Sequence, residues 1–479
     1  MSYERLSVMG GTYSRPAADS AKIQFRRALT LTLMTLVLPG SAQLVMGNKK
    51  IGRIAIRVWL VVLAVIAFLV FVTMTSRTEM FSIMTNPFLM TVGRWFLIVG
   101  AISWVALLID AWRLGAPRQL ARNHRLAMTG INAVLCFVTA GTMFFGAHMI
   151  AVQRQFIGTV FAADTVSKPS DGRYNILLLG GDSGPDRIGL RPDSLTLASI
   201  DQETGRTVLI GLPRNLQNIP FPRGSVMRRQ FPNGFNCAGC ELNGVNTWAN
   251  DNARLFGEKN PGIEATKGAI EEITGLKVNY YALVNMQGFA KLVDAVGGVR
   301  VNVRERTPIG GIGSSIRGYI EAGDQLLTGD QTLWYSRSRV QNDDWSRMGR
   351  QKCVMNDMLQ QLSPKKVLFN AEKIADSSKA LLSTDIPQQD LGVFMDLALK
   401  ARTQKVSTVS LVPPVIYTGN PDFAKVRRIV DKAIAKAEGK TTVDGGIVDA
   451  SLPMADPFAD PEAKDPRKAN ASDDLNASC

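Results

Sequence analysis

The chain has 479 residues, enough for two or three domains, and 46% of them are hydrophobic. The hydrophobic residues are concentrated before about residue 155, so the composition excludes a uniformly soluble chain and indicates a membrane region followed by a soluble domain. The formal net charge is +14 at pH 7. Lys and Arg beside apolar segments contribute to this excess, and no basic module interleaved with aromatic residues is present, which argues against nucleic-acid binding.

Long apolar runs come first. With their flanking residues, three of them can cross a hydrocarbon core of ~30 Å, and we expect spans at about residues 51–75, 88–112 and 127–152. Residues 28–46 are also apolar, but Pro39-Gly40 in their middle would break a spanning helix. We therefore expect a re-entrant or interfacial hairpin there. No small-residue cleavage site closely follows the first long run, which argues against a cleavable signal peptide.

The distribution of Lys and Arg predicts the orientation. Basic residues flank the hairpin on both sides and crowd the loop around Arg118, whereas residues 75–86 carry only Arg77 against Glu79. By the positive-inside rule, residues 1–27 form a cytoplasmic segment and the three spans run out, in and out again. The domain that follows then lies outside the cytoplasm. Four true spans would place it inside, which is the alternative topology.

The soluble domain, expected over residues 173–438, follows a polar connector at 154–172. It opens with three apolar runs bounded by Gly, Pro or Asp, which predict buried strands at 175–179, 195–200 and 208–212. Later segments alternate between helical and strand-like spacing. This alternation predicts an α/β fold, with helices on both faces of a central sheet. Residues 217–250, rich in Pro, Gly and Asn, are expected to form a loop-rich rim around the site and no part of the core, and residues 439–479 a disordered tail.

Charged side chains gather at the ends of these strands. Asp182 and Asp193 flank a loop that carries Arg187 and Arg191, and Arg214 follows the third run. Such positions face the ligand crevice of an α/β sheet. Isolated Asp–Arg pairs are usually solvated and contribute little. Here, however, a second block at 333–351, LWYSRSRVQNDDWSRMGRQ, adds four more arginines. Because carboxylates suit Mg²⁺ and guanidiniums suit phosphate, their convergence predicts a diphosphate and its metal.

These two blocks resemble the LytR-CpsA-Psr family of bacterial cell-wall ligases. The signatures are G-D-x(n)-R-x-D-S at 181–194, L-P-R-N at 212–215 and Y-x-R-x-R…D-x-x-R-x-x-R-Q at 335–351. The resemblance covers roughly residues 175–361. It implies an α-β-α sandwich domain with a central mixed sheet. The implied activity is transfer of a glycan phosphate from a polyprenyl-diphosphate carrier to a peptidoglycan hydroxyl, with release of polyprenyl phosphate.

The resemblance also assigns roles to residues. It implies that Asp182 and Asp193 hold Mg²⁺, and that Asp193, Arg214 and Asp344 are catalytic, Asp344 either orienting an arginine or acting as a base. The expected substrate-binding residues are Arg187, Arg191, Arg214, Arg337, Arg339, Arg347, Arg350 and Gln351. The lipid tail would occupy a hydrophobic tunnel near Arg214. Phe289, Leu292 and Val293, on an expected helix, are candidates for its lining, although such residues are more often ordinary core.

The implied protein is a multi-pass membrane transferase with an extracytoplasmic domain, whose partners are the lipid-linked glycan, peptidoglycan and the membrane. Two other functions keep the same site. Water as acceptor would make the protein a polyprenyl-diphosphate pyrophosphatase, and binding without turnover would make it a wall-glycan receptor or regulator. Appearance of the glycan on peptidoglycan rather than in solution separates transfer from hydrolysis.

The cysteines fall into two groups. Cys237 and Cys240 lie in N-C-A-G-C-E, within a loop expected to be extracytoplasmic. A zinc site lacks further ligands there, because the two His residues are near or inside the membrane, so a small loop disulfide is favoured over free thiols. Cys136 lies within an expected span and Cys353 in an expected helix, and we interpret both as apolar filler.

Overall fold

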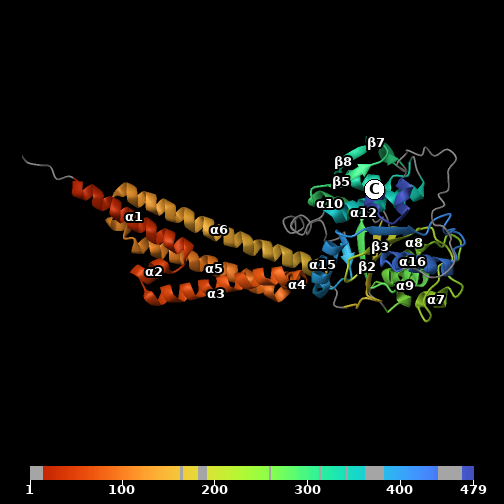
Figure 1. The fold of residues 1–479 in the computed structure, drawn as a ribbon, viewed down its shortest axis with the longest axis horizontal. Coiled ribbons are helices and arrows are strands. Elements are labelled where there is room, and N and C mark those ends of the chain that lie inside the picture. Colours follow the sequence, from red (N-terminus) through yellow and green to blue (C-terminus); the bar gives the residue numbers. More distant parts are fainter. Residues whose placement is uncertain are drawn as a thin grey trace, which may run out of the picture. The chain divides into compact units, whose positions relative to one another are not determined.

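The computed structural model describes residues 15–161, 166–181, 191–257, 260–311, 314–340, 343–361, 382–440 and 466–479. The chain separates into two compact units, Met1–Ala151 and Val152–Cys479 (Figure 1). The candidate site lies wholly in the second unit.

The described part of the first unit is helical (Figure 1). Three segments that begin in this unit are long and apolar enough to cross a membrane: Lys49–Thr75, Pro87–Gln119 and Arg122–Val160. The three expected spans fall inside these segments. The elements here are α1 (Arg15–Val37), α2 (Ser41–Met46), α3 (Lys49–Thr75), α4 (Arg77–Thr85), α5 (Pro87–Leu114), η1 (Pro117–Gln119) and α6 (Arg122–Val160). Because α6 continues to Val160, the connector expected from residue 154 begins as helix.

The chain breaks at Pro39-Gly40. Helix α1 ends at Val37 and α2 begins at Ser41, with Gly40 at a φ of +93° that favours glycine. A Cβ on Gly40 would lie 2.5 Å from the Cβ of Ala55, so glycine also permits the close approach of α3. The break lies where the proline predicts it. Re-entry of residues 28–46 into a membrane stays a prediction.

A mixed sheet forms the centre of the second unit. Its seven strands, among the residues that the structure describes, run in the order β11-β10-β3-β2-β1-β4-β9. β1 is parallel to β4 and β3 to β10, and the other neighbours are antiparallel. The sequence-based prediction of an α/β class with a mixed sheet is therefore confirmed. The strands are β1 (Arg173–Gly181), β2 (Pro192–Asp201), β3 (Thr207–Leu212), β4 (Tyr280–Asn285), β9 (Leu382–Thr384), β10 (Val406–Ser410) and β11 (Ala471–Ser472).

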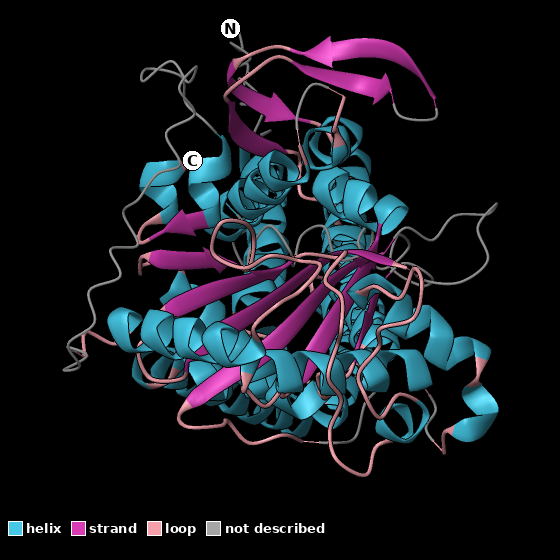
Figure 2. Ribbon diagram, turned by 90° about the vertical axis from the view of Figure 1, so that its right-hand side faces the viewer, coloured by secondary structure: helices cyan, strands magenta, loops and turns pink. Residues whose placement is uncertain are grey.

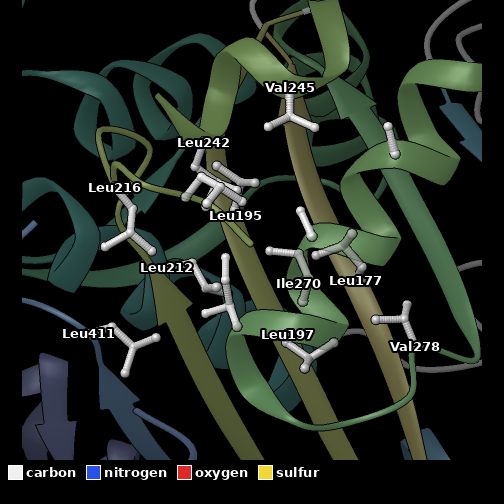
Figure 3. Close-up of a cluster of buried hydrophobic side chains, with 14 of the residues drawn as sticks. Leu177, Leu195, Leu197, Leu212, Leu216, Leu242, Val245, Ile270, Val278 and Leu411 are labelled. Atoms are coloured by element: carbon white, nitrogen blue, oxygen red, sulfur yellow. The ribbon is translucent and has the colours of Figure 1, made fainter. Parts of the chain in front are cut away.

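Alternating residues of the strands pack in opposite directions, as the pleat requires. Leu177, Leu197 and Ile210 join the largest buried cluster, with side chains of α8 (Leu242–Asp251), α9 (Pro261–Thr274) and α16 (Phe423–Ala437). Figure 3 shows several of these side chains converging between the strands and the helices. Their neighbours Ala198 and Leu209 instead pack with Cys353 of α12 (Asp344–Gln361). Figure 2 shows the strands side by side among these helices.

The remaining elements surround the site. Two short antiparallel ribbons pair β5 (Val299–Val303) with β8 (Gly323–Leu327), and β6 (Thr307–Gly311) with β7 (Ser314–Ile320). The other helices of this unit are α7 (Val226–Gln230), η2 (Ala253–Leu255), α10 (Met286–Ala295), α11 (Gly329–Arg337), η3 (Gln388–Asp390), α15 (Leu391–Ala401), η4 (Pro466–Asn470) and α17 (Leu475–Ser478).

Two expectations are corrected. Residues 217–250, expected to lie outside the core, contribute to it, because Ile219, Phe221 and Leu242 are buried in the main cluster. The tail expected to be disordered from 439 to 479 is structured over residues 466–479. There β11 pairs with β10, and Leu475 of α17 is fully buried. Residues 441–465 lie outside the described part of the chain. Both segments contain few consecutive apolar residues, so their composition gave little sign of the burial that tertiary contacts produce.

Candidate functional site at the carboxyl ends of β1 and β4

A cavity of about 450 Å³ lies where the parallel strands β1 and β4 end. Side chains of β1, β2 and β4 form one wall, and α10, α11 and α12 supply the others. The carboxyl edge of parallel strands is the usual ligand position in α/β sheets, because loops diverge there.

The cavity has two chemically different parts. Its polar lining includes Asp193, Ser194, Arg214, Arg337, Arg339, Arg347 and Gln351. Its apolar lining includes Leu178, Ala282, Val284, Phe289, Leu292, Trp334, Val340, Val354, Met355 and Met358. A ligand that fills this space would carry negative charge on one portion and hydrocarbon on another. Of the tunnel candidates, Phe289 and Leu292 line the cavity, whereas Val293 packs in a separate buried cluster.

Asp193 and Arg214 form an ion pair across the ends of β2 and β3. Nη1 of Arg214 lies 2.5 Å from Oδ1 of Asp193, and both side chains are partly exposed to the cavity. Burial by itself lowers the pKa of Arg214. The hydrogen bond and charge of Asp193, together with the charges of Asp344 and Glu241, outweigh burial and raise that pKa above its ordinary value. The guanidinium is therefore permanently charged at the cavity wall.

Asp344 joins two further arginines. Its Oδ2 accepts a hydrogen bond from Nη2 of Arg347 at 2.9 Å, and its Oδ1 lies 3.5 Å from Nη1 of Arg339. Arg347 is almost fully buried. Burial lowers its pKa; the charge of Asp344 opposes that effect, and the nearby Arg214 and Arg339 reinforce it. Of the two roles expected for Asp344, the contacts match that of orienting arginines.

The side chain of Arg347 has an unused donor. Its Nε is buried and makes no hydrogen bond with any described residue. A buried donor without an acceptor is unfavourable, and in native proteins it is often satisfied by a ligand or water. Since Arg347 lines the cavity, an anion bound there would supply the acceptor.

Gln351 is held in place by neutral contacts. Oγ of Ser194 donates to Oε1 of Gln351 at 3.0 Å, and Nε2 of Gln351 donates to the carbonyl oxygen of Ser336 at 3.2 Å. This chain connects β2 to α11 through α12. It also fixes the position of Ser194, which follows Asp193 directly.

Arg350 and Arg191 stand apart from the other predicted arginines. Nε of Arg350 donates to the carbonyl of Tyr335 at 2.8 Å, and its Nη2 donates to the carbonyl of Ser338. Arg350 is buried and outside the cavity lining, where it secures the chain at Ser338, between Arg337 and Arg339; its expected substrate contact stays a prediction. Arg191 donates to Oδ1 of Asn243 at 3.4 Å and is also outside the lining.

The predicted metal pair is only half described. Asp182 lies outside the described residues, as does Arg187. Across the described ranges, no group of three or more His, Cys, Asp or Glu is suited to a metal. Asp193 has the carboxylate oxygens that Mg²⁺ prefers, and Arg214 engages one of them, Oδ1, in this structure.

Several lining residues had no earlier assignment. Val354, Met355 and Met358 follow Arg347 and Gln351 at helical spacing, so they share one face of α12. That spacing is visible in the sequence and would have identified them once one residue of the face was known. Trp334 and Val340 lie outside α12, so no helical spacing from Arg347 would have identified them.

The cysteines form two disulfides. Cys237 is bonded to Cys240, and Cys353 is bonded to Cys479. The interpretation of Cys353 as apolar filler is therefore wrong. Its partner lies far away in sequence, and only the folded chain brings the two sulfur atoms together.

Known proteins share the region that holds this cavity. A family model described as the LytR_cpsA_psr family matches residues 150–428. Among curated relatives, the polyisoprenyl-teichoic acid–peptidoglycan teichoic acid transferase TagU of Oceanobacillus iheyensis is 28% identical over 224 residues, 46% of this chain and 61% of that protein. The TagU of Halalkalibacterium halodurans is 24% identical over 275 residues, 54% of this chain and 80% of that protein. The match thus spans less than two thirds of the first of these relatives.

Solved structures are also similar at low identity. Bacillus subtilis TagV is 20% identical with a TM-score of 0.42, covering 57% of this chain and 99% of that one. TagT bound to LIIa-WTA is 18% identical with a TM-score of 0.41, covering 57% and 94%. The family model covers more than half of the chain, including β1 to β4 and all the charged residues of the cavity. The chain belongs to the LytR_cpsA_psr family.

Proposed function

We propose that this protein transfers an anionic glycopolymer from a polyprenyl-diphosphate carrier to a hydroxyl group of peptidoglycan and releases polyprenyl phosphate. The observation that supports this function most directly is the two-part cavity, in which Arg214 and Arg347 adjoin an apolar wall. A lipid-linked diphosphate has the matching two parts. The names of the TagU relatives, teichoic acid transferases acting on peptidoglycan, support the same class of donor and acceptor.

The arginines suit a diphosphate better than a single charge. Four of them line the cavity, and the lowered pKa of Arg347 reflects burial together with their mutual repulsion. An anion with two or more charges offsets that repulsion and satisfies the free Nε of Arg347. A carboxylate ligand would leave much of this positive charge uncompensated.

In the reaction, the acceptor hydroxyl oxygen attacks the phosphorus that carries the glycan. The bond from that phosphorus to the bridging oxygen breaks, and its electron pair stays on that oxygen in the departing polyprenyl phosphate. The hydroxyl proton passes to solvent. Such transfers depend on positioning and charge stabilisation more than on a protein nucleophile. Arg214 and Arg347 are placed to stabilise the phosphoryl oxygens, and Asp344 orients Arg347 and Arg339. Mg²⁺ would be held by Asp193 and Asp182 and would supply further neutralisation of the diphosphate.

We also propose an extracytoplasmic position for a catalytic domain of α-β-α sandwich architecture, behind a multi-pass membrane region. Two disulfides support the location, because such bonds persist in oxidising compartments. The arrangement of basic residues around the apolar helices supports the same orientation. Burial of alternating strand residues against helices on opposite faces supports the architecture.

The test uses the full chain in detergent, a polyprenyl-diphosphate donor with a labelled glycan, and peptidoglycan. We expect release of polyprenyl phosphate coupled to label on peptidoglycan. Release with the label in solution would instead establish a pyrophosphatase. Tight donor binding without release would establish a receptor, and chelation of divalent cations tests the metal.

A further inference from the structure

Helix α12 has two functional faces. Arg347, Gln351 and Met355 point into the cavity. The residues between them, Lys352 and Cys353, are buried elsewhere and contact the segment of residues 466–479, here named the C-terminal clasp. The side chains that bind the ligand and those that hold the clasp therefore share one rigid helix.

Asn470 of the clasp contacts α12 at two points. Its Nδ2 donates to the carbonyl of Trp345 at 2.7 Å, in the first turn of the helix beside Asp344 and Arg347. Its Oδ1 accepts from Nζ of Lys352 at 3.4 Å and from Oγ of Ser410 at 2.9 Å. One amide thus joins α12 to β10 and fixes the turn that carries the site arginine.

The buried side chain of Lys352 depends on its hydrogen bonds with Ser410 and Asn470. Its ammonium is completely buried, and no described carboxylate forms a salt bridge with it; Nζ donates to Ser410 and Asn470. Burial lowers the pKa of Lys352 to about 7. A buried amino group that loses a hydrogen-bond acceptor is destabilised, so α12 is held where Asn470 stays within reach.

Covalent and backbone contacts hold the clasp itself. The disulfide between Cys353 and Cys479 ties its end to the middle of α12. β11 adds to the edge of the sheet beside β10, with Ala471 opposite Val409. Nδ2 of Asn356 donates to Oδ1 of Asn476 at 2.7 Å, one helical turn beyond Lys352. The clasp therefore connects α12 with the edge of the sheet.

We propose that the C-terminal clasp is a positioning element of the site, which sets the location of Arg347 and Gln351 through Asn470 and the Cys353–Cys479 bond. The inference rests on the proposed function, since lipid-diphosphate binding is what this placement serves. None of the clasp residues touches the cavity. Their effect on binding is therefore indirect, and α12 provides the route that we propose.

The test compares two variants of the full chain in detergent. Asn470→Ala removes the link to Trp345 and Lys352 but leaves the disulfide; the double variant Cys353→Ala/Cys479→Ala does the reverse. Asp473→Asn is the matched control, because Asp473 belongs to the clasp but pairs with Lys436 at 2.7 Å on the exposed surface. Binding of geranylgeranyl diphosphate is measured well below the melting midpoint of each protein.

We expect each test variant to bind roughly tenfold more weakly, because charged hydrogen bonds to the diphosphate depend on arginine position. The control should bind like the wild type. Lowered melting midpoints with unchanged affinities in both test variants would overturn the inference and leave the clasp a purely stabilising element. If the double variant does not fold, the affinity of Asn470→Ala alone decides whether the clasp positions the site.

A second measurement separates this inference from the proposed function. Hydrogen exchange over residues 344–351 should become faster in both test variants and stay unchanged in the control. A wild-type protein that does not bind geranylgeranyl diphosphate would contradict the proposed function. In that case, unchanged exchange over α12 would overturn the positioning role, and faster exchange confined to α12 would support it.

Discussion

The carboxylate of Asp344 lies 2.9 Å from Nη2 of Arg347 and 3.5 Å from Nη1 of Arg339, so one acidic residue bridges two cavity arginines. Arg339 precedes α12 and Arg347 lies within it, and the bridge therefore joins a loop to a helix. Asp344 is itself absent from the cavity lining. Its contacts orient the groups that face the ligand.

Replacing Asp344 by Asn should therefore slow transfer, because Arg339 and Arg347 lose the charge that orients them. The change keeps the volume of the side chain but removes its charge. We expect kcat/KM for the lipid-linked donor to fall by roughly 10- to 100-fold, since hydrogen bonds between charged groups contribute about 1.5–3 kcal/mol. Asp324→Asn, which breaks an exposed pair with Arg300, serves as control. Normal activity of Asp344→Asn would remove Asp344 from the site.

Asp193 and Arg214 should both be indispensable. Asp193→Asn removes the proposed metal ligand, and Arg214→Lys replaces a planar fork by a single ammonium. Each should lower transfer by ~2–4 kcal/mol in transition-state terms, the scale of a lost preorganised electrostatic contact. The assay is metal-dependent release of polyprenyl phosphate. Full activity of Asp193→Asn in the presence of chelator would contradict the metal assignment.

The apolar wall should discriminate by lipid length. Leu292→Trp introduces a larger side chain into the cavity lining. We expect weaker binding of a long polyprenyl diphosphate but unchanged binding of inorganic diphosphate, because only the hydrocarbon portion meets the new ring. Leu326→Trp, at an exposed leucine outside the lining, is the control. Equal loss for both ligands would show that the substitution disturbs the charged part instead.

The buried Lys352 should make stability rise with pH. Burial lowers its pKa to about 7 from the ordinary value of 10.5, so between these pH values the unfolded chain binds the proton that the folded chain has released. Stability then increases with pH, by at most about 1.4 kcal/mol per pH unit, and the burial penalty is greatest below pH 7. Melting midpoints of the full chain from pH 7 to 10 should rise more steeply in the wild type than in Lys352→Met. Parallel curves would contradict a lowered pKa.

Reporter fusions test the orientation of the membrane region. A reporter placed after Val152 should be external and one placed after Gln119 cytoplasmic, because positive residues stay on the cytoplasmic side. An internal reporter after Val152 would mean an even number of crossings, and residues 28–46 would then span the membrane.

Local patterns in the sequence determined the secondary structure and the kind of site. Apolar runs predicted β1, β2 and β3, because a strand that is buried on both faces consists of consecutive apolar residues. Pro39-Gly40 predicted the break before α2, because proline cannot continue a helix. Spacing of acidic and basic residues at strand ends predicted an anion site. These features depend on neighbours along the chain.

Only the tertiary structure decided which residues form that site. Arg347 and Arg350 belong to the same motif and are only about 60° apart around the helix axis, yet Arg347 lines the cavity and Arg350 is buried outside its lining. The partner of Cys353 lies 126 residues away, and no local pattern encodes that distance. Residues 466–479 are polar and looked disordered, but an exposed edge of β10 and the buried face of α12 give them a place to pack. Such outcomes depend on contacts between segments distant in sequence, which composition and periodicity do not record.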